Sequence, residues 1–386
     1  MDLVAVAKSF FLFAVIALAF APLMTWIERK QSALMQDRLG ANRADVLGFT
    51  FIGLFHPVAD MLKMVTKEVV VPEGAHRLIY TLSPYVAAIP ALISFAVIPY
   101  GGTYEAFGTR FSLVVADLDW GVLYVLAIAS IATYGSMLAG WASNSNFGML
   151  GSLRVSAQML SYEVAMGISL IGVFLCFGTL RLTEMGVAQQ ETFRLLGFLE
   201  HFGWLAPGNA LVDWLRLPMW GIFLQPLAFF LFLTAIMAEN KRAPFDTPEG
   251  ESELVAGYFT EYSGMNFGIY LMAEWIEVVV IAGLVTAMFL GGWSIPWLRD
   301  AQLVEALSGP LGADWGNLAA MAIHVGVFFA KVIALIFFQM LVRWSMPRFR
   351  YDQVMNLGWK ILLPLSLANI VLTALGILVV KGVTGT

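Results

Sequence analysis

The sequence predicts an all-α integral membrane protein, a bundle of about eight transmembrane helices with an amphipathic surface helix after the first span. Hydrophobic residues make up 59% of the 386 residues and charged residues only 13%, whereas about a quarter of a soluble domain is charged. Eight apolar runs are each long enough, at roughly 18 residues or more, to cross the ~30 Å hydrocarbon layer as a helix. No internal repeat divides the chain, so we expect one membrane domain over residues 1–386.

The first apolar run, residues 3–27, ends at the charged triplet Glu28-Arg29-Lys30. It is longer than the apolar core of a signal peptide, and no small-residue cleavage motif precedes the triplet, so we expect a retained span. The other seven predicted spans lie at about residues 81–100, 121–141, 155–178, 217–238, 267–290, 318–342 and 361–380.

Residues 46–71, between the first two spans, are only moderately apolar. Hydrophobic side chains recur there at helical spacing against the polar residues Asp60, Lys63 and Lys67. The segment is too polar to span the bilayer and suits a helix that lies on the membrane surface, either as a plain anchor or as a functional lid. Pro57 is expected to break or kink this helix.

Lysine and arginine are distributed unevenly between the two sides of the predicted bundle. If both termini face outward, the segments 28–80, 142–154, 239–266 and 343–360 share one side and hold 14 of the 22 basic residues. Seven lie on the opposite side, and Lys331 lies within a span. Because Lys and Arg are enriched in cytoplasmic loops, these segments are predicted to be cytoplasmic and both termini periplasmic. No basic run indicates a nucleic-acid partner.

The loop of residues 239–266 is the most informative stretch of the chain. From Glu239 to Gly264 it carries six carboxylates and two basic residues between two long apolar runs. Carboxylates close to a bilayer are costly unless they are hydrated, paired or used to carry protons, so we expect function in this loop. The opposite segment 179–216 has no spacing that implies chemistry, and is predicted to be a solvated cover with a turn at 207–209.

Five ionisable side chains lie well inside predicted spans: Glu163, Glu274, Glu277, Lys331 and, as a weaker case, His324. A charge that faces lipid costs roughly 2.5–3.5 kcal/mol on insertion scales, so each is expected to point into the bundle or towards water. Two roles are open for them. They are proton-carrying sites, or they form internal ion pairs that hold helices in register, for example Glu277 with Lys331.

A row of carboxylates predicts a lateral proton path through the protein. Burial raises the pKa of a carboxylate and a nearby cation lowers it, so a site between these effects loads and releases a proton near neutral pH. Arg154 is such a cation near Glu163, and the acids of the loop lead from Asp246 towards Glu274 with coupled titrations. Electrons must come from another chain, since the single Cys176 can hold no iron–sulfur cluster and His324 is the only histidine in a span.

Six long motifs carry a resemblance that covers almost the whole chain. They are WIERKQSALMQDRLGAN (26–42), HPVADMLKMVTKE (56–68), GWASNSNFGMLGSLRVSAQMLSYEV (140–164), ENKRAPFDTPEGESELVAGYFTEYS (239–263), FGIYLMAEW (267–275) and PRFRYDQVMNLGWK (347–360). In these motifs the chain resembles the H-subunit family of respiratory complex I, the proton-translocating NADH:quinone oxidoreductase. The resemblance implies a membrane component that forms the quinone entrance and tunnel and couples quinone reduction to proton translocation.

The resemblance also implies roles for single residues in the matching motifs. The implied quinone-binding residues are Glu28, Arg29, Gln36, Arg38, Asp60 and Phe245. The implied proton path comprises Glu163, Glu239, Asp246, Glu249, Glu251, Glu253, Glu261, Tyr262 and Glu274, supported by the basic residues Arg154 and Arg242. No catalytic residue, metal ligand or redox centre of its own is expected in this chain.

The resemblance finally implies the surroundings of the protein. They are a bacterial inner membrane, ubiquinone or menaquinone as substrate, and FMN and iron–sulfur clusters held by peripheral partner subunits. Small membrane subunits and antiporter-like subunits complete the implied complex. The alternatives are the anchor of a related ferredoxin-dependent or hydrogenase complex, whose loop is expected to lack the full PEGESELVAGY string, a stand-alone ion-coupled transporter, and a purely structural anchor.

Overall fold

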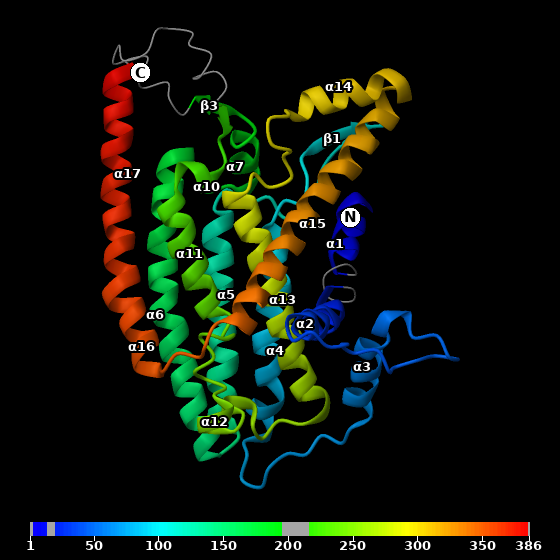
Figure 1. Cartoon of the computed structure of the whole chain (residues 1–386), viewed down its shortest axis with the longest axis vertical. Helices are drawn as coiled ribbons and strands as arrows, with labels where there is room; N and C mark the ends of the chain where they lie inside the picture. The colour runs from blue at the N-terminus through cyan, green and yellow to red at the C-terminus, as the bar shows by residue number, and fades with distance from the viewer. Residues whose placement is uncertain (1–2, 14–19, 195–215, 385–386) are drawn as a thin grey trace.

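The computed structural model describes residues 3–13, 20–194 and 216–384, and these form a mainly helical bundle (Figure 1). Six helical segments of this described part are long and apolar enough to cross a membrane. They are α4 (Arg77–Ser94, extended by a 3-10 turn to Val97), α5 (Gly121–Ala142), α6 (Asn146–Phe177), α13 (Gly264–Phe289), α15 (Ala313–Ser345), and α16 with α17 (Tyr351–Asn356 and Leu363–Thr384, joined by a π-helical segment). The expected all-α membrane fold is confirmed.

The remaining predicted spans are covered by shorter helices. Helices α1 (Leu3–Phe13) and α2 (Ala21–Met35) lie in and beyond the first apolar run, of which residues 14–19 are outside the described part. The fifth run holds α10 (Gly221–Leu224) and the apolar α11 (Pro226–Glu239). Pro226 opens α11, because a proline is tolerated in the first turn of a helix. The division into eight spans and one domain stays a prediction.

The surface segment is helical over a shorter range than its spacing predicts. A 3-10 turn (Phe51–Gly53) is followed by α3 (His56–Thr66), which packs on α2 and α13. The expectation that Pro57 breaks the helix is confirmed, because α3 begins only at His56 and no α-helix precedes it in the described residues of the segment. Pro57 lies in the first turn of α3, where its missing N–H leaves no helical hydrogen bond unmade, and so it starts the helix.

Helix α13 is the centre of the bundle and packs against α2, α3, α4, α11 and α15. From Ala273 to Phe289 every side chain is buried except Glu277, which is partly buried. Helix α15 slants across the bundle and α17 stands at its edge (Figure 1). On α17, Val371, Leu375 and Leu378 are exposed apolar side chains, as expected for a helix face that meets lipid.

Small residues bring the helices and the acidic loop into close contact. A Cβ on Gly135 of α5 would lie 2.6 Å from the backbone nitrogen of Ala87 of α4. A Cβ on Gly151 of α6 would lie 2.7 Å from the carbonyl carbon of Gly257, in the 3-10 turn Gly257–Phe259 of the acidic loop. Glycine at these positions therefore lets α6 support the loop directly, as small residues do between membrane helices.

The end of the bundle opposite the acidic loop carries two small hairpins that the sequence patterns did not predict. Strand β1 (Thr103–Ala106) pairs antiparallel with β2 (Thr109–Ser112), and β3 (Thr192–Arg194) with β4 (Arg216–Pro218). These hairpins lie near α7 (Leu182–Ala188) and α14 (Asp300–Leu311), whereas α12 (Glu251–Leu254) marks the acidic-loop end (Figure 1). The turn expected at 207–209 lies outside the described residues.

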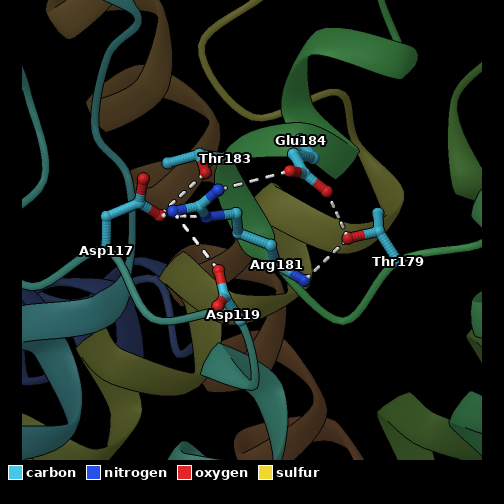
Figure 2. Close-up of polar contacts among 6 residues, drawn as sticks. All are labelled: Asp117, Asp119, Thr179, Arg181, Thr183 and Glu184. Atoms are coloured by element: carbon cyan, nitrogen blue, oxygen red, sulfur yellow. Dashed lines mark hydrogen bonds and ion pairs between the residues drawn. The ribbon is translucent and has the colours of Figure 1, made fainter.

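An exposed ion-pair cluster fixes the chain between α6 and α7. Arg181 lies 3.2 Å from Asp117, 3.4 Å from Asp119 and 3.3 Å from Glu184, which also accepts a hydrogen bond from Thr179 (Figure 2). The hydrogen bond from Thr179 and the charge of Arg181 lower the pKa of Glu184. This end of segment 179–216 is thus polar and exposed, and its contacts tie the loop before α5 to α7.

Candidate functional site

Arg242, in the loop after α11, lies at the centre of a buried ion-pair cluster. Its guanidinium nitrogens lie 3.8 Å from Glu28 of α2 and 3.9 Å from Glu274 of α13. The guanidinium carbon lies 3.8 Å from the centroid of the Trp275 ring, and Arg343 of α15 binds the other oxygen of Glu28 at 2.7 Å. Side chains of Arg242, Glu28 and Glu274 are at most 13% exposed, so water screens their interaction only weakly. The cluster joins three helices and the loop at one point.

Glu249 connects the loop to Glu274. Burial, and then the negative charges of Glu274 and Asp246, raise the pKa of Glu249 well above its usual range. Arg242 acts in the opposite direction. The Tyr258 hydroxyl, from the same loop, lies 3.3 Å from a carboxylate oxygen of Glu274. The charge of Glu274 thus acts directly on the protonation of Glu249.

Two further loop acids are paired with arginines from other elements. Asp246 lies 2.5 Å from Arg348 of the segment after α15, and Glu253 lies 2.5 Å from Arg154 of α6. Burial raises the pKa of Asp246, and the charge of Arg348 opposes that rise. Glu253 is half exposed, so its ion pair is of the weak, solvent-screened kind.

The acids of the membrane part lie deeper in the bundle. Glu163 of α6 accepts a hydrogen bond from the Ser130 hydroxyl of α5. Glu239, at the end of α11, is only 6% exposed, and neither of its carboxylate oxygens has a hydrogen-bond partner. Glu239 and Glu277 line a cavity of about 50 Å³ that is otherwise almost wholly apolar. A cavity of this size has room for a few water molecules at most.

Tyr262 lies in a row of hydroxyl groups between α4 and α13. Its ring stacks on Tyr80 at a centroid distance of 4.2 Å, and the Tyr80 hydroxyl donates to the backbone carbonyl of Glu261 at 2.8 Å. The Ser83 hydroxyl contacts the hydroxyls of both Tyr262, at 3.1 Å, and Tyr270. A hydroxyl both donates and accepts, so this row can pass a proton.

An apolar cavity of about 170 Å³ lies between α2, α3 and α13, next to the Arg242 cluster. Arg29 and Asp60, whose charged groups are 2.6 Å apart, lie in its wall. Trp275 forms another part of that wall and stacks on Arg242 from there. Four methionines, Met61, Met64, Met265 and Met272, line much of the rest of it, and Lys63 is a further charged residue of the wall. The cavity thus combines an adaptable apolar surface with a few charged groups, as pockets for apolar ligands with a polar end do.

Other predicted site residues are placed away from this cavity. Gln36 and Arg38 are exposed at the end of α2, where the Arg38 side chain donates to Gln36 at 2.7 Å. Phe245 is buried in the core, with its ring 5.8 Å from Tyr162 and 5.5 Å from Phe349. The side chain of Glu251 lies outside the described residues.

Lys331 and His324 are held by partners at the opposite end of the bundle. The Lys331 ammonium donates to the backbone carbonyls of Leu290, Gly292 and Ser294 at 2.7, 3.0 and 2.7 Å. These carbonyls follow the C-terminus of α13, where a cation is favoured. The proposed ion pair of Lys331 with Glu277 is wrong, because Glu277 lies twelve residues before the end of α13, or about 18 Å along the helix.

His324 belongs to a buried polar cluster with groups from two other elements. Its Nδ1 lies 2.6 Å from the hydroxyl of Tyr104 on β1, and its Nε2 lies 3.4 Å from Asp300 of α14. Trp293 and Gln190 donate to the other oxygen of Asp300 at 2.9 and 2.7 Å. These contacts explain how an ionisable side chain is accommodated in α15. Among the described residues, no group of three or more His, Cys, Asp or Glu could hold a metal ion.

Comparison with known proteins identifies the family. A family model described as NADH dehydrogenase matches residues 7–374. The chain is 41% identical over 363 residues to an H subunit of the NADH-quinone oxidoreductase of Cytophaga hutchinsonii, covering 94% of each chain. It belongs to the H-subunit family of NADH-quinone oxidoreductase. The chain is 42% identical over 358 residues to an H subunit from Geobacter metallireducens, covering 93% of this chain and 92% of the relative. It is 43% identical over 354 residues to the H subunit from Thermomicrobium roseum, covering 91% of this chain and 90% of the relative. The resemblance seen in the motifs is confirmed.

Several partners in the site of this H-subunit family member were missed from the sequence. Gln158 of α6 donates to the backbone carbonyls of Ala238 and Phe245, both at 2.8 Å, and accepts from Thr247, so it holds both ends of the first turn of the loop. A neutral side chain such as Gln158 does not stand out when a sequence is examined for charged residues. Arg343 and Arg348 could have been identified as partners of the loop acids, since they lie in a segment predicted on the same side as the loop.

Proposed function

We propose that this chain is the membrane subunit of an NADH-quinone oxidoreductase that admits the quinone and couples its reduction to proton translocation. The observation that carries the proposal is the continuity at Trp275, which lines the 170 Å³ cavity and stacks on Arg242, the arginine between Glu28 and Glu274. A ligand in that cavity would lie next to the first carboxylates of a chain of acids.

The cavity suits the head and tail of a quinone. A long isoprenoid tail needs apolar surroundings, and the methionine-rich wall between α2, α3 and α13 offers them. The head group needs polar partners, and Arg29 with Asp60 offers them within the same wall. Glu28, Gln36, Arg38 and Phe245, none of which lines this cavity, complete the proposed quinone-binding residues.

The carboxylates supply the coupling. Reduction of the quinone changes its charge and protonation, and this change acts first on Glu28 and Glu274 through Arg242. Glu249 and Asp246 respond because the charge of Glu274 acts on both. The shift continues through Glu239 to Glu163, from which protons move to antiporter-like subunits. Glu251, Glu253, Glu261, Tyr262 and the basic Arg154 border this path from the loop.

Because this chain is proposed to hold no redox centre of its own, the proposal requires partner subunits. Electrons reach the quinone from peripheral subunits that hold FMN and iron–sulfur clusters, and the acidic loop faces them from the cytoplasmic side of a bacterial inner membrane. Both termini are then periplasmic. An anchor of a ferredoxin-dependent or hydrogenase complex is the alternative, and the family membership favours the quinone reductase.

Glu163→Gln tests the proposal in the assembled complex. The substitution keeps the size and the hydrogen bond to Ser130 but cannot carry a proton, so we expect assembly to persist and the number of protons pumped per electron to fall at least twofold. The measurement is proton uptake by proteoliposomes during NADH-driven quinone reduction. Glu305→Gln, an exposed acid of α14, is the matched control. Unchanged pumping by an intact Glu163→Gln complex would remove that residue from the path.

A further inference from the structure

Lys241 is a buried cation for which the path described above has no role. It follows the end of α11 and is only 3% exposed. Its backbone has a left-handed conformation, with φ 56°, which is unfavourable for a residue other than glycine. A buried lysine in a strained turn calls for an interaction that keeps it there.

The neutral groups around Lys241 do not balance its charge. Its ammonium lies 3.4 Å from the Ser136 hydroxyl of α5 and 5.6 Å from the centroid of the Tyr258 ring. An ammonium has three donors, and burying it without a compensating charge is far more costly than burying a neutral group. The compensation must come from acids close by.

Two acids are placed to provide it. Glu239 ends α11 two residues before Lys241, and the charge of Lys241 acts on Glu239 and on Glu277 of α13. These two acids line the same 50 Å³ cavity, and Glu239 has no hydrogen-bond partner for either oxygen. The other charges that act on the pair are Glu163 from α6, Glu274 from α13 and Arg242 from the loop.

We infer that Lys241 is a positioning residue of the proton path, whose ammonium neutralises one negative charge shared by Glu239 and Glu277 across their cavity. One cation and two carboxyl groups are electrically neutral when the two acids hold a single proton between them. That proton can move from Glu277, three residues from Glu274, to Glu239, on which the charge of Glu163 acts. The group therefore bridges the loop acids and Glu163. This inference rests on the proposed function.

Lys241→Gln and Lys241→Arg in the assembled complex test the inference. Without the cation, both acids are expected to bind protons, so Lys241→Gln should add a protonated-carboxyl band to the infrared spectrum of the resting complex. It should also lower proton uptake by proteoliposomes at least tenfold per electron. Lys241→Arg keeps the charge and should retain most of the uptake, and Lys360→Gln, an exposed lysine, should match the parent protein.

Each outcome decides the inference. A Lys241→Gln complex with the parent's infrared spectrum and pumping overturns it. Normal pumping by that complex while Glu163→Gln loses pumping overturns this inference alone and leaves the proposed function standing. Normal pumping by Glu163→Gln, in contrast, contradicts the proposed path through Glu163 itself. If Lys241→Gln does not assemble, Glu277→Gln decides, since the inference requires it to lose pumping and normal pumping there overturns it.

Discussion

Replacing Arg242 by glutamine should change both the stability and the pH dependence of the complex. The guanidinium lies 3.9 Å from Glu274, and at an effective dielectric constant of about 20 this separation corresponds to an attraction of about 4 kcal/mol. Removing one partner of a buried pair typically destabilises by about 3–5 kcal/mol. Glu28 keeps Arg343 at 2.7 Å, so the loss falls mainly on Glu274. We expect a loss near the lower end, about 3 kcal/mol.

The pH dependence has a definite sign. The pKa of Glu249 is already raised by burial and by Glu274, and Arg242 opposes that rise. Without Arg242 the pKa rises further, so the ionised fraction of Glu249 at a given pH falls. A relay that needs this acid to release its proton then fails earlier on acidification. The acidic limb of the pH profile of quinone reductase activity should therefore move to higher pH in Arg242→Gln.

The assays are thermal inactivation of the purified complex and NADH:quinone reductase activity across pH. Arg350→Gln is the matched control, because that arginine is 76% exposed and lies 3.8 Å from Asp352, a pair worth at most about 1 kcal/mol. An assembled Arg242→Gln complex with the parent's inactivation temperature and pH profile would refute the reasoning that this arginine holds the cluster together.

Two further substitutions separate structure from function. Lys331→Met removes three charge-assisted hydrogen bonds to backbone carbonyls beyond α13 and should lower the free energy of unfolding by about 3 kcal/mol. The number of protons pumped per electron should not change. A melting temperature equal to the parent's would contradict the capping role of Lys331. Gly268→Leu places a side chain in the 170 Å³ cavity and should raise the KM for long-tailed quinone but not slow NADH oxidation by ferricyanide. Gly326→Leu is the control for Gly268→Leu, because a Cβ at Gly326 meets nothing within 4 Å. Equal KM values for the two variants would exclude the cavity as a quinone-binding site.

The fold class and the acidic loop that carries the candidate site could be predicted from the sequence, because hydropathy and clustered charges are local properties. Apolar runs predict α13 and α15 directly, and the density of acids after Glu239 marks the loop. The partners were not readable, because they depend on which helices meet. The ion pair of Lys331 with Glu277 was predicted from their opposite charges alone. In the structure the backbone carbonyls that follow the end of α13 lie nearer to Lys331 and accept its hydrogen bonds.

Neutral and irregular features were also beyond the sequence patterns. Gln158 holds the loop through uncharged bonds that no charge count detects. The helix expected over 46–71 was shortened to α3 because Pro57 favours the first turn. The hairpin β1–β2 is too short, at four residues a strand, to produce a clear alternating pattern in a chain dominated by apolar runs.

The most direct test of the account is the infrared difference spectrum that accompanies quinone reduction in the intact complex. If the acids beside the cavity relay protons, reduction should change carboxyl bands, and Glu274→Gln should remove one of these changes while Glu305→Gln removes none. Identical carboxyl changes in Glu274→Gln and the parent protein would contradict the claim that quinone chemistry is transmitted through these side chains.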